Sequence, residues 1–300
     1  MTLLELIESS AQQLTEAEVS FGHGTTNAFD EAAWLVLHSL GLPLDTTVRG
    51  EDSEQNRLVA PEERAQAATL LIARITTRKP AAYLTHEAWL QGVAFFVDER
   101  VIVPRSLIAE LLVDGGIDYW LKQSSHTVLD LCTGNGSLAV IAAMVYPDVV
   151  VDAADISGDA LAVARINVDK HDLAQRITLL ESDGLHNVRG PYDLILCNPP
   201  YVNAKSMAAL PPEYLAEPFI ALDGNQNGGS DGMDFVRSLL RDVSRHMASD
   251  GVLVLEIGNE RAFFEAAFPM LEVVWLDTSA GEDQVVLIPR EALTRSNDRQ

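Results

Sequence analysis

From about residue 105 onward, short β-prone runs alternate with helical stretches, and no other feature of the sequence limits the fold as strongly. Helical spacing of apolar residues falls near 137–146, 158–170 and 231–248. An alternating β-α order predicts an α/β fold with a seven-stranded, mostly parallel sheet covered by helices on both faces. Ligands bind such sheets beyond the carboxyl ends of the strands. The expected strands are 127–131, 149–155, 176–181, 192–197, 251–257, 271–276 and 284–288.

The first hundred residues have a different, largely helical pattern. Apolar residues recur at three- and four-residue spacing in three segments, and Asn27 is placed to cap the second of them. Farther on, two short apolar runs separated by charged residues indicate a β-hairpin. We therefore expect a small helical domain at 1–86, a linking hairpin at 87–104 and the α/β domain at 105–300. The three helical segments are 3–18, 28–40 and 62–78.

The chain is strongly acidic, with 21 Lys and Arg against 44 Asp and Glu and a net charge of −23. Such a charge repels phosphates and argues against tight, sequence-independent binding to nucleic acid. It suits a basic macromolecular partner, although an acidic surface that only keeps the protein soluble is the simpler alternative.

The sequence carries no targeting, membrane or metal signal. No apolar run approaches the roughly 18 residues that suggest a membrane span, and the N-terminus lacks the basic and apolar regions of a secretory signal. Cys132 and Cys197 have the spacing of neither a zinc site nor a redox pair. We expect a cytoplasmic protein with no membrane contact and no bound metal.

The sequence DLCTGNG connects the first expected strand of the α/β domain to its first helix. Gly134 and Gly136 would allow a tight turn and a close approach of a ligand to the backbone. Together with Ala139 they match the G-x-G-x-x-[G/A] dinucleotide pattern, which on its own is a weak signal. The next strand ends in Asp155, whose carboxylate could accept from both hydroxyls of a ribose, in NAD or in S-adenosylmethionine.

Two further acids distinguish between these cofactors. Asp130 ends the first strand, where a carboxylate facing the cleft can pair with the ammonium group that S-adenosylmethionine has and NAD lacks. Asp183 follows the third strand and is placed to accept from an adenine amino group. For Asp183 alone, a helix cap or a solvated loop residue is an equally good interpretation. The order of these acids after successive strands favours S-adenosylmethionine.

The fourth strand ends in Asn198, Pro199, Pro200 and Tyr201, which have to form a stiff loop. Two consecutive prolines remove two backbone donors and fix two φ angles, so neither a central strand nor a helix can continue. The side chain of Asn198 and the carbonyl of Pro199 can accept both hydrogens of a planar NH2 group and so orient its nitrogen. Tyr201 could pack against one side of that flat group.

With these motifs in this order, the sequence resembles the class I S-adenosylmethionine-dependent methyltransferases that carry an NPPY motif and have a Rossmann-like fold. Three further segments are similar to the glutamine N(5)-methyltransferase (HemK-like) family, and the resemblance covers most of the chain. Residues 21–45 look like the N-terminal signature of the branch that modifies the third protein of the large ribosomal subunit. The three segments are VDERVIVPRS (97–106), EYLAEP (213–218) and ALDGNQNGGSDGMDF (221–235).

The resemblance implies methyl transfer from S-adenosylmethionine to the side-chain amide nitrogen of a glutamine in that basic ribosomal protein, free or in a pre-ribosomal particle. The helical domain would recognise this partner, and no sequence-specific contact with nucleic acid is expected. Asn198, Pro199, Pro200 and Tyr201 would hold the glutamine, with Asn198 also beside the cofactor. The other implied cofactor contacts are Asp130, Thr133, Gly134 and Gly136 for the methionine part, Asp155 for the ribose and Asp183 for the adenine end.

Several alternatives remain open at this point. The same pocket would suit the Gly-Gly-Gln loop of a peptide release factor, or, less well given the charge, the amine of a nucleic-acid base. NAD-dependent oxidoreduction and a catalytically silent assembly factor are the readings from other functional classes. Arg105 and Glu217 lie in family-like segments near the cleft, and we interpret His23 as a loop histidine that caps a helix. The glycine-rich loop at 223–232 is longer than the usual turn of the family.

Overall fold

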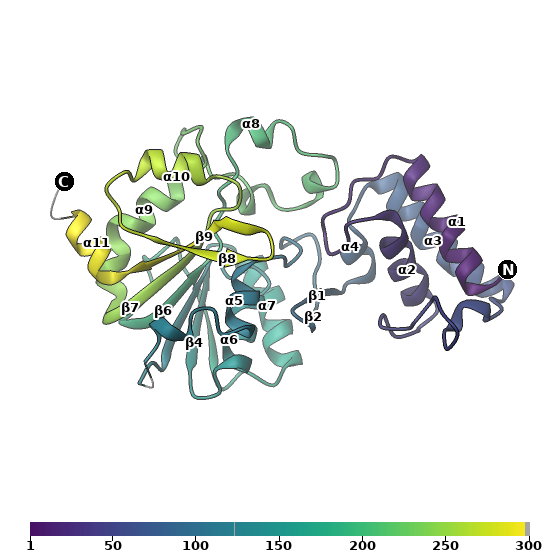
Figure 1. Cartoon of the computed structure of the whole chain (residues 1–300), viewed down its shortest axis with the longest axis horizontal. Helices are drawn as coiled ribbons and strands as arrows, with labels where there is room; N and C mark the ends of the chain where they lie inside the picture. The colour runs from purple at the N-terminus through teal and green to yellow at the C-terminus, as the bar shows by residue number, and fades with distance from the viewer. Residues whose placement is uncertain (123, 298–300) are drawn as a thin grey trace.

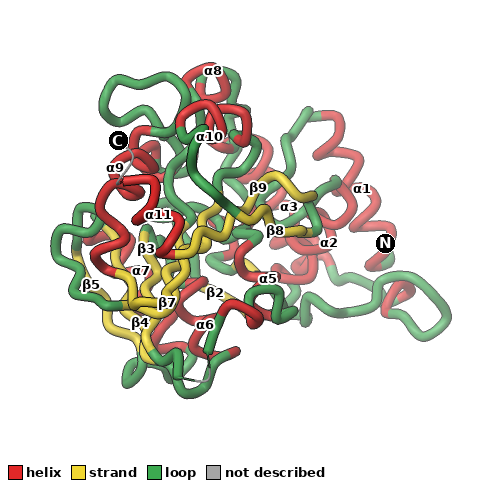
Figure 2. Tube along the Cα trace, turned by 60° about the vertical axis from the view of Figure 1, so that its left-hand side comes forward, coloured by secondary structure: helices red, strands yellow, loops and turns green. Residues whose placement is uncertain are grey.

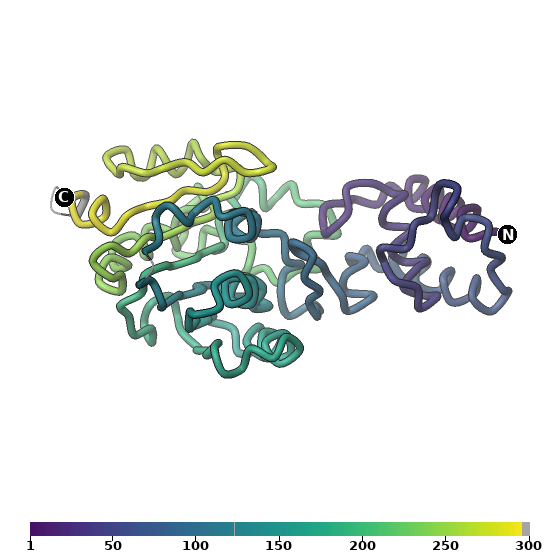
Figure 3. Tube along the Cα trace, turned by 60° about the horizontal axis from the view of Figure 1, so that its bottom comes forward, coloured from purple at the N-terminus to yellow at the C-terminus, as the bar shows by residue number. Residues whose placement is uncertain are grey.

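A helical region and an α/β region make up the structure, a computed structural model that describes residues 1–122 and 124–297. The helices are α1 (Leu3–Glu16), α2 (Ala28–Ser39), α3 (Pro61–Thr77), α4 (Ala81–Thr85), α5 (Ile108–Val113), α6 (Ser137–Val145), α7 (Gly158–Lys170), α8 (Ala204–Met207), α9 (Asp234–Asp242), α10 (Arg261–Ala267) and α11 (Arg290–Asn297). The strands are β1 (Ala88–Leu90), β2 (Val93–Phe95), β3 (Thr127–Leu131), β4 (Val150–Asp155), β5 (Ile177–Glu181), β6 (Tyr192–Cys197), β7 (Met247–Glu256), β8 (Val274–Thr278) and β9 (Gly281–Pro289). Figures 1 and 3 show α1 to α3 at one end of an elongated molecule and the sheet at the other.

The N-terminal helices follow their sequence patterns closely. As predicted, Asn27 caps α2, because its side chain accepts a hydrogen bond from the amide of Asp30 at 3.0 Å. Helix α3 begins with Pro61, whose fixed φ suits the first helical position. The periodic pattern does not reveal α4, since five residues are too few for a helical repeat to be recognised.

The predicted hairpin is present, but it is shorter than expected. β1 and β2 pair antiparallel around Gln91 and Gly92, whose φ angles of 50° and 75° suit a two-residue turn. The first apolar run therefore supplies both strands. The second run is not a strand, and Val101 and Val103 are instead buried in the core that the helical region shares with α7.

The seven-stranded, mostly parallel sheet predicted from the sequence is confirmed. Its strand order is β5-β4-β3-β6-β7-β9-β8. The first five strands in this order run parallel, and β9 pairs antiparallel with both β7 and β8. β3 lies between β4 and β6, so the chain adds β4 and β5 on one side of β3 and then returns to add β6 and β7 on the other. This reversal of strand order is the place where open α/β sheets bind their ligands.

Both faces of the sheet are buried, as expected for parallel strands. Neighbouring residues of one strand point to opposite faces, so Leu194 and Leu196 pack with α5 and α6 while Ile195 and Cys197 pack with α9 and α11. Figure 2 shows the strands running between helices. None of the helices in the described part of the chain has the length and hydropathy that a bilayer-spanning segment needs.

Several predicted boundaries toward the C-terminus are wrong. The helix expected at 231–248 ends at Asp242, because the chain then makes a short 3-10 turn and Met247 begins β7 by pairing with Tyr192. The strand expected at 271–276 is β8, which starts three residues later, where pairing with β9 begins. Pairing between distant segments decides these ends, and local periodicity carries no information about it.

Candidate active site

A cavity lies beyond the carboxyl ends of β5, β4, β3 and β6, which are neighbours in the sheet. Each strand contributes a predicted residue near its end, because parallel strands present their carboxyl ends on one edge. The predicted residues that line the cavity are Gly134, Asp155, Asp183, Asn198 and Pro200. Five others lie near it without lining it: Asp130, Thr133, Gly136, Pro199 and Tyr201.

Asp155 joins the glycine loop to the start of the next helix. Its Oδ2 accepts a hydrogen bond from the amide of Gly134 at 2.9 Å, and its Oδ1 accepts one from the amide of Ser157 at 2.9 Å. Burial raises the pKa of Asp155, and these backbone hydrogen bonds oppose the rise. The carboxylate therefore holds the shape of the loop and also faces the cavity, where its remaining lone pairs can accept from a ligand.

Asp130 is fully buried rather than facing the cleft as the sequence suggested. Its Oδ2 accepts hydrogen bonds from the hydroxyl of Thr133 and from the amide of Ala139 at 3.0 Å, which closes the glycine loop onto α6. Burial raises the pKa of Asp130 to about 7. Its Oδ1 is buried and receives no hydrogen bond from any residue that the structure describes.

The two glycines of the loop serve different purposes. Gly134 has a φ of +55°, and a Cβ placed there would meet no atom within 4 Å, so its backbone is open to the cavity. Gly136 has a φ of +81°, and a Cβ there would lie 3.2 Å from the Cβ of Ala164. Gly136 is therefore required where α6 packs against α7, and it does not line the cavity. Cys132, the first residue after β3, also lines the cavity.

The loop after β6 carries two hydrogen-bond acceptors that the described residues leave free. Asn198 lines the cavity, and no described residue forms a hydrogen bond with its side chain or with the carbonyl of the adjacent Pro199. Two backbone hydrogen bonds of Val202 hold the loop to residues 222–224. The amide of Val202 donates to the carbonyl of Leu222, and the amide of Gly224 donates to the carbonyl of Val202. The backbone of the loop is therefore fixed by residues 222–224, while the amide side chain of Asn198 lines the cavity.

Tyr201 does not line the cavity, and its ring and hydroxyl instead contact other parts of the chain. Its ring packs so closely against Gly258 that a Cβ there would lie 2.5 Å from Cε2. Its hydroxyl lies 3.5 Å from Oε1 of Glu256, a buried carboxyl that accepts from Ser106 Oγ at 2.5 Å and from the amide of Leu107 at 3.0 Å. Burial raises the pKa of Glu256 to about 7 and raises that of Tyr201 as well.

Beside the cavity, Arg105 and Glu217 form a two-point ion pair, with nitrogen-to-oxygen distances of 2.6 and 2.7 Å. Burial alone would raise the pKa of Glu217, but the nearby His23 and Arg105 outweigh it and lower this pKa to about 2. His23 is 2% exposed, with Nε2 3.6 Å from Glu217 and its ring 4.3 Å from the ring of Tyr214. The interpretation of His23 as a helix cap is therefore wrong, since Asn27 caps α2.

Sequence reasoning missed the buried carboxyl groups Glu256 and Glu213 and the arginine Arg74 that pairs with Glu213. An acid at the end of a core strand was the available signal for Glu256, and nothing local distinguishes Arg74 from a surface arginine. Among the described residues, no cluster of three or more His, Cys, Asp or Glu side chains is placed to hold a metal ion.

Comparison with known proteins agrees with this geometry. Residues 112–217 match the methyltransferase small domain family. The solved structure of the hMettl16 catalytic domain, in complex with MAT2A 3'UTR hairpin 6, superimposes with a TM-score of 0.51 at 13% identity, covering 76% of this chain and 81% of that one. At this identity the likeness shows the fold alone, which is the Rossmann-like fold of class I methyltransferases, as predicted. The methyltransferase domain implies S-adenosylmethionine as the methyl donor.

Curated relatives match nearly the whole chain. The ribosomal protein uL3 glutamine methyltransferase of Bordetella pertussis (strain Tohama I) is 50% identical over 97% of this chain and 96% of its own length. The enzyme of the same name from Burkholderia pseudomallei (strain K96243) is 49% identical over 96% and 94%, and that from Bradyrhizobium diazoefficiens is 46% identical over 96% and 90%. With this identity along its whole length, the chain belongs to the ribosomal protein uL3 glutamine methyltransferase family.

Proposed function

We propose that the protein transfers a methyl group from S-adenosylmethionine to the side-chain amide nitrogen of a glutamine in ribosomal protein uL3, in the cytoplasm. The observation that carries the proposal is the pair of free acceptors at the end of β6, Asn198 Oδ1 and the Pro199 carbonyl, beside a cavity with acidic residues suited to the cofactor. The names of the relatives support uL3 as the substrate.

The residues around the cavity suit S-adenosylmethionine. The carboxylate of Asp155 would accept from its ribose hydroxyls, and Asp183 would accept from its adenine amino group. Asp130 Oδ1 is a buried acceptor without a donor, which is what an ammonium group nearby would satisfy. When bound, the cofactor supplies an electrophilic methyl group.

The chain's own contribution to the reaction is orientation. An amide nitrogen is a poor nucleophile because its lone pair is conjugated with the carbonyl. If Asn198 Oδ1 and the Pro199 carbonyl each accept one amide hydrogen, they fix the direction of the nitrogen and draw its lone pair out of conjugation. The nitrogen loses a proton readily once it carries the methyl group, so no strong base is required in the motif.

The acidic chain suits a basic ribosomal protein, free or within a pre-ribosomal particle. We assign recognition of this partner to the helical region, residues 1–86, because it stands at one end of the molecule, apart from the sheet (Figure 1). No sequence-specific contact with nucleic acid is required by this scheme.

Incubating the enzyme with labelled S-adenosylmethionine and a lysate that lacks its own modification tests the proposal. We expect the label on one glutamine of uL3, located by mass spectrometry of its peptides. Label on a release factor and none on uL3 would overturn the choice of substrate. Binding of NAD without binding of S-adenosylmethionine, measured by calorimetry, would overturn the methyltransferase assignment.

Asn198→Ala tests the role of the loop. We expect turnover to fall by about 100- to 1000-fold while the affinity for S-adenosylmethionine changes by less than about threefold. The exposed Asn227, whose side chain forms no hydrogen bond with a described residue, provides the matched control Asn227→Ala. Full turnover by Asn198→Ala would overturn the proposed orientation of the amide by this loop.

A further inference from the structure

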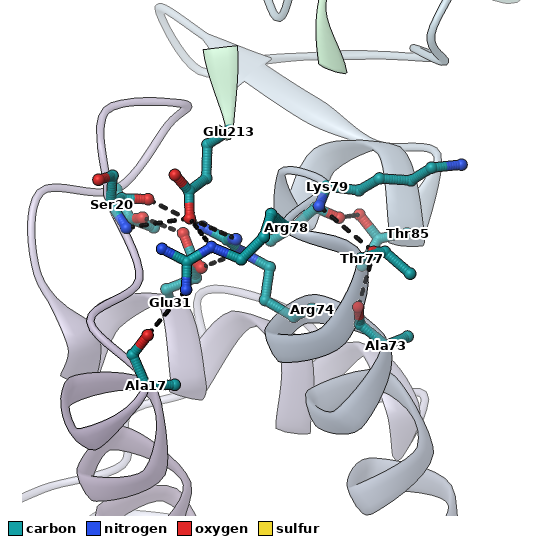
Figure 4. Close-up of polar contacts among 12 residues, drawn as sticks. Ala17, Ser20, Glu31, Ala73, Arg74, Thr77, Arg78, Lys79, Thr85 and Glu213 are labelled. Carbon is teal, nitrogen blue, oxygen red and sulfur yellow. Dashed lines mark hydrogen bonds and ion pairs between the residues drawn. The ribbon is translucent and has the colours of Figure 1, made fainter. Parts of the chain in front are cut away.

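Residues 211–221, here called the wall segment, follow α8 and form part of the cavity. Pro218, Ile220 and Ala221 of this segment line the same cavity as Asp155. In Figure 1 the loop after α8 extends toward the helical region, and its contacts with that region are shown in Figure 4. The wall segment therefore touches both the cavity and the N-terminal helices.

Apolar burial contributes little to the position of the wall segment, although the partly buried Ala216 packs against the core of the helical region. Its two short 3-10 turns, Tyr214–Ala216 and Phe219–Ala221, contain no buried residue, and Leu215 and Phe219 are each 66% exposed. By contrast, two of its carboxylates, on Glu213 and Glu217, are buried. The position of the segment therefore depends on the polar groups that meet these two acids.

Glu213 is anchored entirely by the helical region. Its Oε1 accepts a hydrogen bond from the amide of Ser20 at 3.1 Å and lies 2.8 Å from Arg78 Nε and 3.5 Å from Arg74 Nη1 (Figure 4). Its side chain is fully buried, and these partners precede it by more than a hundred residues in the chain. The contacts therefore join two distant parts of the sequence.

The group that receives Glu213 is itself rigidly built. Arg74 is fully buried at the last turn of α3, where it donates from Nε to Glu31 at 2.6 Å and from Nη2 to the carbonyl of Ser20 at 2.8 Å. Two arginines face two glutamates, Glu31 and Glu213, so the charges of the cluster balance, with Arg78 partly exposed at its edge. Removing one member leaves an uncompensated buried charge, which is strongly unfavourable.

The second acid ties the same segment to the catalytic side. Glu217 receives Arg105 and the amide of Val103 at 2.9 Å, both from the stretch that follows the hairpin. Tyr214, between the two acids, has its ring beneath the guanidinium of Arg105 at 5.5 Å. Glu213 thus connects the wall segment to the helical region, and Glu217 connects it to the stretch after the hairpin and also to His23 of the helical region at 3.6 Å.

We propose that Glu213 is a positioning residue: held by Arg74 and Arg78, it lets the helical region set the position of the cavity wall. The N-terminal helices then shape the cofactor site in addition to any contact with the substrate. Loss of this anchor should release residues 214–222 while leaving the strands of the sheet in place.

Glu213→Gln tests the proposal, because glutamine keeps the length of the side chain and removes its charge. We expect amide hydrogen exchange in residues 214–222 to accelerate by about tenfold or more, and the affinity for S-adenosylmethionine to fall by about fivefold in calorimetry. Neither measurement uses the protein substrate, so both retain their meaning if uL3 is not methylated. If uL3 is methylated, its KM should rise more than kcat falls.

Leu3→Ala is the control for loss of stability alone. Leu3 is fully buried at the start of α1, close to the N-terminus, which Figure 1 marks at the end of the molecule away from the sheet. We expect this variant to lower Tm without accelerating exchange in residues 214–222. Wild-type exchange and affinity in Glu213→Gln, or equal changes in Leu3→Ala, would overturn the proposal. If Glu213→Gln does not fold, Arg78→Gln removes one contact to the same acid and should change both readouts in the same direction, by smaller factors; no change would overturn the proposal.

Discussion

The buried carboxylate of Glu217 offers a quantitative test of the electrostatics beside the cavity. It accepts two hydrogen bonds from Arg105 at 2.6 and 2.7 Å and one from the amide of Val103 at 2.9 Å. Glu217→Gln keeps the shape of the side chain but removes its charge, so the guanidinium of Arg105 loses its counter-ion. The expected loss of stability can be worked out from the pKa of the carboxyl group.

Burial favours the neutral form of Glu217, but His23 and Arg105 together lower its pKa from 4.5 to about 2. One unit of pKa corresponds to about 1.4 kcal/mol, so the charged form stabilises the fold by about 3 kcal/mol at neutral pH. Because the folded-state pKa is the lower one, this contribution is complete above the unfolded pKa of 4.5 and is lost as the pH falls toward 2.

We expect Glu217→Gln to lower the free energy of unfolding by about 3 kcal/mol at pH 7 and by about 2 kcal/mol at about pH 3.5, in urea titrations followed by circular dichroism. Glu265→Gln is the matched control, because Glu265 pairs with Arg261 at 2.9 Å on the surface. This control should change the free energy of unfolding by less than about 1 kcal/mol at both pH values. A loss in Glu217→Gln that does not depend on pH would refute the reasoning.

Three further substitutions examine other parts of the site. Asp155→Asn should weaken binding of S-adenosylmethionine by about tenfold or more in calorimetry, because this carboxylate faces the cavity and holds the amide of Gly134; unchanged affinity would exclude Asp155 from the cofactor site. Gly136→Ala should lower the free energy of unfolding by about 1 to 2 kcal/mol, because the new Cβ would lie 3.2 Å from that of Ala164 at a φ of +81°; wild-type stability would contradict the tight packing. Glu256→Gln should stabilise the protein by about 2 kcal/mol more at about pH 8 than at about pH 5, because a carboxyl pKa raised to about 7 means that wild-type stability declines as the pH rises above 4.5. An effect of Glu256→Gln that is equal at both pH values would show that this carboxyl is not kept protonated.

The predictable part of the fold is the part with strong local signals. The strands expected at 127–131 and 192–197 match β3 and β6 to the residue, because each is a continuous apolar run with a turn signal after it. The cap at Asn27 is equally local, since its bond to Asp30 spans three residues. The short helices and the start of β7 depend on contacts that local periodicity does not contain.

The site divides in the same way. Asp155 ends a strand and Gly134, Asp183 and Asn198 follow one, and the rule for parallel sheets is sufficient to bring them to one edge. That rule does not specify which way a side chain turns. Asp130 is placed at the correct strand end, but its carboxylate is fully buried and its Oδ2 accepts from Thr133 and Ala139.

The sequence by itself determined the alternation of strands and helices, the rigid loop after β6 and the order of the acids around it, because these properties reside in neighbouring residues. Only the tertiary structure decided that the hydroxyl of Tyr201 lies against Glu256, and that Glu213 is buried against Arg74, 139 residues away in the chain. The physical reason is that a charge can be buried only where the folded chain places a hydrogen-bonding or oppositely charged partner beside it. A linear sequence does not show which distant residues will meet.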